Sequence, residues 1–74
     1  SKQVAITKEG KYFLEGRSVS ESGLVDEISR EVKYRPNMRV TLSADESLSY
    51  GSVSRVMGLL RKCGVTRMAL SVKK

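Results

Sequence analysis

Seven basic side chains in the second half of this 74-residue chain are the groups best suited to bind a partner: Arg39, Arg55, Arg61, Lys62, Arg67, Lys73 and Lys74. Residues 36–74 contain only two acids, Asp45 and Glu46, so this half carries +5, whereas seven basic and six acidic residues leave residues 1–35 at +1. Such a basic half indicates nucleic acid, an acidic lipid surface or an acidic polymer as partner, or a charge that serves only solubility.

A small basic RNA-binding domain is one specific interpretation of this charge. RNA readers stack bases on aromatic side chains or clamp the backbone with a GXXG loop. Only four aromatic residues occur, Tyr12, Phe13, Tyr34 and Tyr50, with no RNP-type aromatic strand and no GXXG loop. The RNA interpretation therefore stays as an alternative from a different functional class.

The sequence offers no catalytic constellation. It has no histidine, the commonest acid–base group and the usual partner of a catalytic serine or cysteine. Neither a nucleophile-elbow nor a P-loop motif occurs. Cys63 is the only cysteine, so no intrachain disulfide can form, and scattered carboxylates do not indicate a zinc site. We expect a protein that is not an enzyme and has no metal or cofactor.

The length allows one domain, spanning residues 1–74. A domain of this size buries only about 60% of its unfolded-chain surface, so a second copy is its expected additional support. No apolar run is long enough to span a membrane and no signal peptide is visible. We interpret the chain as a soluble fragment of a longer protein.

Hydrophobic periodicity predicts the order ββαβαβ. Residues 3–7 and 12–14 form a predicted hairpin with Gly10 in its turn, and a helix follows from Ser20, its N-cap, to near Pro36. A strand over 40–45, a helix that starts near Ser49 and is stopped by Gly64, and a strand over 67–72 complete the pattern. This order predicts an α+β two-layer sandwich, a mixed sheet with two helices on one face.

Several single residues allow a functional and a structural interpretation. Asp45 is either a contact residue or, as favoured, a cap for nearby backbone N–H groups. Tyr50 either faces a partner or, as favoured, heads the apolar stripe of its helix as a core residue. Met57 and Met68 are expected to pack. Cys63 is expected to be a small buried hydrophobe rather than a reactive thiol.

An ordered set of residues carries a resemblance to a known family. Ala44-Asp45 ends a strand, Tyr50 opens the next helix, Val56-Met57 lies within it, and Gly64-Val65 precedes the final strand. In this order and spacing the set resembles the periplasmic domain of the ExbD/TolR family. The hairpin residues 10–16 favour a TolR-type member.

The resemblance implies a non-catalytic periplasmic C-terminal domain of a bacterial inner-membrane protein, preceded by a transmembrane helix outside this chain. The family's proton-carrying aspartate lies in that helix, so Asp45 is not assigned proton transfer. A TolR-type subunit serves the Tol-Pal complex, driven by the proton-motive force, in outer-membrane integrity and cell division. An ExbD-type subunit energises TonB-dependent import.

The resemblance also implies partners. These are a TolQ/ExbB-like membrane subunit, a TolA/TonB-like protein and a second copy, the last expected to pair through the strand at 67–72, where an exposed sheet edge can template pairing. Peptidoglycan is favoured as the anionic partner because its carboxylates can pair with arginine. The candidate contacts are Arg55, Arg61, Lys62 and Arg67, and nucleic acid is not expected.

Overall fold

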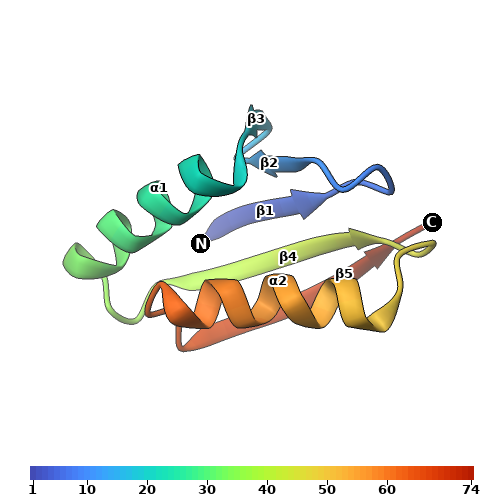
Figure 1. The fold of residues 1–74 in the computed structure, drawn as a ribbon. Coiled ribbons are helices and arrows are strands. Elements are labelled where there is room, and N and C mark those ends of the chain that lie inside the picture. The colour runs from blue at the N-terminus through green and yellow to red at the C-terminus, as the bar shows by residue number, and fades with distance from the viewer.

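A five-stranded mixed sheet carries two helices on one face in the computed structural model, which describes all 74 residues (Figure 1). The elements are β1 (Lys2–Ile6), β2 (Tyr12–Leu14), β3 (Arg17–Val19), α1 (Glu21–Tyr34), β4 (Arg39–Asp45), α2 (Tyr50–Lys62) and β5 (Arg67–Lys73). The strand order is β3-β2-β1-β4-β5, in which β1, β4 and β5 are parallel and the two hairpin pairings are antiparallel. The predicted α+β sandwich is confirmed.

Strand β3 was not predicted. It follows β2 through a two-residue turn in which Glu15 has φ 51° and Gly16 has φ 81°, and positive φ at both positions is the signature of a type I′ hairpin. Glutamate is an uncommon residue for the first position, so the sequence did not signal the turn. The Glu15 carboxylate accepts the Gln3 N–H at 2.8 Å and the Glu15 N–H donates to the Gln3 carbonyl, which holds this conformation in place.

Both helices begin and end on local signals that the sequence contains. The Ser20 hydroxyl accepts the Gly23 N–H at 3.0 Å and so caps α1, and the Ser49 hydroxyl does the same for α2. Gly64 has φ 104° and its N–H reaches the Arg61 carbonyl, while the Val65 N–H reaches the Leu60 carbonyl. These two bonds are a Schellman motif, which turns the chain from α2 into β5.

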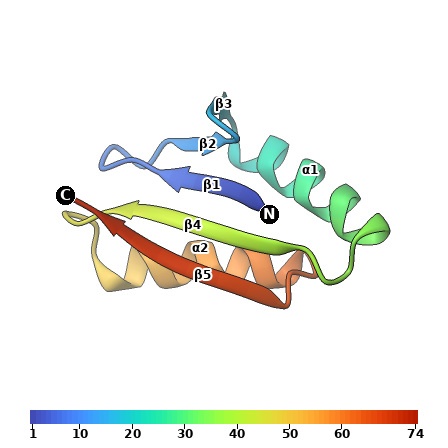
Figure 2. The same cartoon turned by 180° about the vertical axis from the view of Figure 1, so that it is seen from behind.

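The core is entirely hydrophobic and lies between the sheet and the helices. Strand β4 contributes Val40, Leu42 and Ala44, which are all buried beneath the helices. Their register partners on β5 are Met68, Leu70 and Val72, which share the same face of the sheet. β5 is the outermost strand of the sheet (Figure 2). Leu70 is 47% and Val72 60% exposed, so this strand leaves apolar surface uncovered.

Both helices end where the long strands begin. Strands β1, β4 and β5 are parallel and therefore start at one end of the sheet, with Lys2 opposite Val40 and Arg39 opposite Arg67. Helix α1 leads into β4 and α2 into β5 through short loops, so both helices finish at that end, which lies to the left in Figure 1. The N-terminus of the chain lies toward the same end.

Candidate functional site

Six basic residues gather at the end of the domain where β4 and β5 begin, and we call them the basic end. They are Lys33 and Arg35 at the close of α1, Arg39 at the start of β4, Arg61 and Lys62 at the close of α2, and Arg67 at the start of β5. All six are exposed, and none takes part in the three ion pairs of the chain.

The basic end accounts for the whole net charge of +6. The other eight basic residues are equal in number to the eight acidic ones. No acid occurs between Glu31 and Asp45 or after Glu46, and Glu31 itself pairs with Lys2 at 3.4 Å. The domain is therefore a charge dipole whose positive pole attracts anions.

Two arginines of the basic end stand side by side on the face of the sheet that no helix covers. Arg39 and Arg67 are register partners on neighbouring parallel strands. Successive side chains of a strand point to opposite faces, and since Val40 points to the helices, Arg39 points to the bare face. Like charges directly opposite one another destabilise a sheet, and no carboxylate compensates this pair. An arrangement that works against stability is a candidate for function.

The structure divides the four basic residues that the sequence singled out. Arg61, Lys62 and Arg67 belong to the basic end, whereas Arg55 lies in the middle of α2 and pairs with Glu21 of α1 at 3.2 Å. The Tyr12 hydroxyl donates to the same carboxylate, at 3.2 Å, and burial raises the pKa of this phenol above its ordinary value. Arg55 thus ties the two helices together and has less freedom to bind a ligand.

Arg39 is the residue that charge counting alone undervalued. It is one of seven basic residues in the sequence, and nothing in its local pattern marks its pairing with Arg67. The signal was the register of two parallel strands, which becomes visible only once both strand limits are known.

Asp45 organises the turn that leads from β4 to α2. Its carboxylate accepts the backbone N–H of Ser47 at 2.8 Å and the Ser47 hydroxyl at 2.6 Å. These hydrogen bonds hold the pKa of Asp45 below its usual value. The geometry is that of an Asx turn, in which the side chain satisfies the backbone ahead of it.

The prediction that Tyr50 belongs to the core is wrong. Its side chain is 87% exposed, while Val53, Val56 and Leu60 form the buried face of α2. Tyr50 is the first residue of the helix, and Leu48, in the loop before it, packs against this part of the core instead. Tyr50 is therefore available at the surface.

The remaining single residues pack against the core. Met57, Met68 and Cys63 are partly buried, and the Cys63 sulfur lies 3.9 Å from the Val25 carbonyl oxygen. No group of three or more metal-ligating side chains occurs in the structure.

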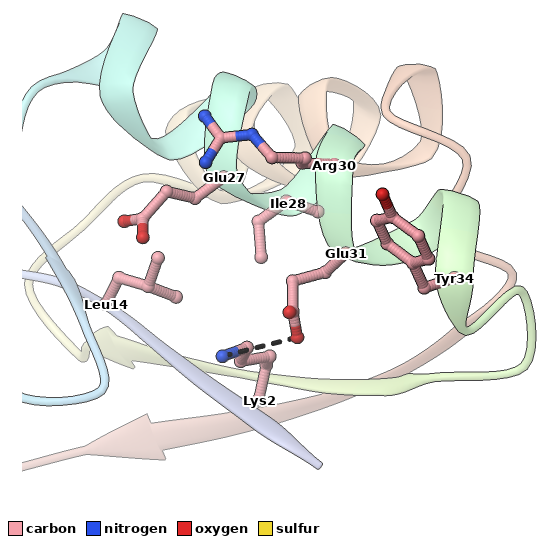
Figure 3. Close-up of a pocket in the computed structure, with 7 residues that line it drawn as sticks. All are labelled: Lys2, Leu14, Glu27, Ile28, Arg30, Glu31 and Tyr34. Atoms are coloured by element: carbon pink, nitrogen blue, oxygen red, sulfur yellow. Dashed lines mark ion pairs between the residues drawn. The ribbon is translucent and has the colours of Figure 1, made fainter.

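The surface pockets of the domain are small or shallow. One of about 120 Å³ lies between α1 and the first two strands, and the ion pair of Lys2 with Glu31 crosses it (Figure 3). Arg30 and Tyr34 stand at its rim. A shallower one lies at the opposite end of the sheet from the basic end and includes Asp45. The molecule presents surfaces for interaction rather than an enclosed ligand site.

Residues 1–74 match the family model described as "Biopolymer transport protein ExbD/TolR". The chain belongs to the ExbD/TolR family. It is 30% identical over 67 residues to the "Biopolymer transport protein ExbD" of Pseudomonas aeruginosa, an alignment that covers 90% of this chain and 50% of that protein. The chain spans about half the length of this curated relative.

Proteins of the ExbD/TolR family are transport-related and non-catalytic. They are anchored in the inner membrane, place a domain in the periplasm, and work with ExbB/TolQ-like and TonB/TolA-like proteins. In the 74 residues described here, neither helix has the length and apolar character needed to cross a bilayer.

Proposed function

We propose that the chain is the periplasmic domain of a non-catalytic, TolR-like subunit of the proton-driven Tol-Pal envelope complex. The match to the family model over the whole chain supports the role shared by the family. The hairpin residues 10–16 favour the TolR type, whereas the curated relative is named ExbD. In this role the domain transmits motion that a preceding membrane helix generates, and works with a TolQ-like membrane subunit and a TolA-like protein.

Deleting the gene in its host bacterium separates the TolR type from the ExbD type. Loss of outer-membrane integrity, with detergent sensitivity and incompletely divided cells, is the result expected from the TolR type. A defect confined to TonB-dependent nutrient import would assign the ExbD type instead. Selective RNA binding by the purified domain at physiological salt would contradict both.

We also propose that two copies pair through β5. This strand is the outer edge of the sheet, and unpaired N–H and C=O groups of an edge strand can template a further strand. Antiparallel pairing centred on Leu70 places the two Leu70 side chains together and Met68 opposite Val72, which would cover apolar surface now exposed. The same register places Arg67 opposite Lys73, a like-charge contact that salt weakens.

Self-association should therefore rise with concentration and with salt in sedimentation equilibrium. We expect Leu70→Lys to leave a monomer, because a charge on an exposed edge opposes strand pairing while the core stays intact. Tyr34→Lys is the matched control, since it introduces the same charge at another exposed apolar side chain, 83% accessible. A wild-type chain that stays monomeric at every concentration and salt level would contradict pairing through β5.

A peptidoglycan contact through α2 is the second proposal about partners. Arg61 and Lys62 are exposed, adjacent and unpaired at the close of α2, with Arg67 and Arg55 as flanking contacts. Carboxylates of the stem peptides match these groups chemically.

Co-sedimentation with purified sacculi tests the contact. We expect Arg61→Gln/Lys62→Gln to reduce the pelleted fraction severalfold, with Arg55 left unchanged because its pair with Glu21 joins the helices. Lys8→Gln/Lys11→Gln is the control, since it removes the same charge from the exposed turn between β1 and β2. Equal loss in both variants would mean that net charge alone governs pelleting.

A further inference from the structure

We propose that the Arg39–Arg67 pair binds phosphate groups of anionic phospholipids and turns the basic end toward a membrane surface. The pair combines three properties: its members are in register on neighbouring strands, both are exposed, and neither has a carboxylate partner. A bound anion between the two guanidinium groups would relieve the repulsion that the register imposes.

Phosphate is the anion that this pair fits. The guanidinium group is a planar fork whose donors bind two oxygens of a phosphate at once, and it sheds its hydration more easily than an ammonium group does. Four of the six residues of the basic end are arginines. The two side chains lie on an open sheet face rather than in a pocket, so they suit a group presented on a surface.

The surroundings favour a lipid surface over a free anion. An anionic bilayer surface attracts basic residues held close to it by about 1 kcal/mol per lysine or arginine. Tyr34 ends α1 directly before Arg35 and is 83% exposed, and tyrosine is a residue that settles at the level of lipid headgroups. The positive charges of the basic end and the amphipathic ring of Tyr34 thus lie at the same end of the domain.

The end at which the chain enters the sheet indicates which end of the domain faces the membrane. This step rests on the proposed function. Lys2 is the register partner of Val40, next to Arg39, so the chain enters the sheet at the basic end. An anchor that precedes residue 1 would hold this end nearest the bilayer. The opposite end, with the turn between β1 and β2, would point away from it. Arg61, Lys62 and Arg67, the proposed peptidoglycan contacts, lie at the same basic end, so the lipid contact and the cell-wall contact would exclude each other at any one time.

Vesicle co-sedimentation of the 74-residue chain tests the proposal. We expect binding to vesicles that contain phosphatidylglycerol, weakening as salt rises, and little binding to pure phosphatidylcholine. Arg39→Gln/Arg67→Gln should weaken partitioning about thirtyfold, the effect of removing two cations that act at the surface. Lys8→Gln/Lys11→Gln removes the same charge at the far end and should change binding far less. Circular dichroism checks that both variants fold.

Several results would overturn the lipid assignment. Equal weakening by both variants would mean that net charge alone governs binding. Equal binding to vesicles of phosphatidylcholine, whose headgroup contains phosphate but is neutral overall, would show that anionic charge of the lipid plays no role. If inorganic phosphate, at a concentration equal to that of the lipid, released the chain from the vesicles, the pair would be assigned to a soluble oxyanion. If Arg39→Gln/Arg67→Gln lost binding to sacculi but kept binding to vesicles, the pair would be assigned to peptidoglycan binding. Because vesicle binding requires no motor partner, these outcomes are independent of the gene-deletion test.

Discussion

Replacing Leu42 by alanine is expected to lower the free energy of unfolding by about 3 kcal/mol. Leu42 is fully buried in β4, which pairs with β1 on one side and with β5 on the other. Its removal leaves a cavity that close-packed neighbours fill only in part. A domain this small has little stability to lose, so the urea midpoint should fall steeply.

Leu70→Ala is the matched control for this measurement. Leu70 is the register partner of Leu42 on the same face of the sheet, but it is 47% exposed. The same change of residue should cost well under half as much when measured at concentrations low enough to keep the chain monomeric. Equal losses would mean that β5 is covered in solution even in the monomer and that the exposed edge does not exist.

Gly64→Ala is expected to cost about 2–4 kcal/mol, because two penalties add. Gly64 has φ 104°, a conformation that residues with a Cβ rarely adopt and that costs about 1–3 kcal/mol elsewhere. A Cβ atom here would also lie 2.9 Å from a methyl group of Val32 on α1. Thermal and urea unfolding of the two proteins measure the difference.

Two further variants separate these penalties. Adding Val32→Ala to Gly64→Ala removes the contact but keeps the backbone strain, so the double variant should lose less than the sum of the single ones. Gly58→Ala, in the middle of α2 with open space around it, should instead stabilise the chain by up to about 1 kcal/mol. A neutral Gly64→Ala would contradict the Schellman geometry at the end of α2.

Elements with strong local signals were predictable from the sequence. Ser20 caps α1 and Gly64 stops α2 because side-chain and backbone chemistry at these positions acts over a few residues. Strand β3 was missed because its turn depends on Glu15 at positive φ, which hydrogen bonds to the distant residue Gln3 stabilise. Tyr50 was misplaced because helical periodicity does not tell which side chain covers the end of a helix.

The candidate site was predictable in its charge but not in its geometry. The excess of basic residues after position 36 is a property of composition, and three of the four residues chosen from it lie at the basic end. Pairing of Arg55 with Glu21 joins residues 34 positions apart, and the Arg39–Arg67 pair depends on strand register. Both arise from tertiary structure, which no short window of sequence contains.

The parallel arrangement of β1, β4 and β5 has a mechanical consequence. A load that is applied along the strand axis at the start of β1 and resisted at β5 would act parallel to the strands. It must pass through two parallel ladders, the first with five residue pairs and the second with seven. Loaded in shear, the hydrogen bonds of each ladder share the force and break together, whereas a peeling force would open them one at a time. A sheet loaded in this way would act as a stiff link between the start of β1 and its outer edge at β5.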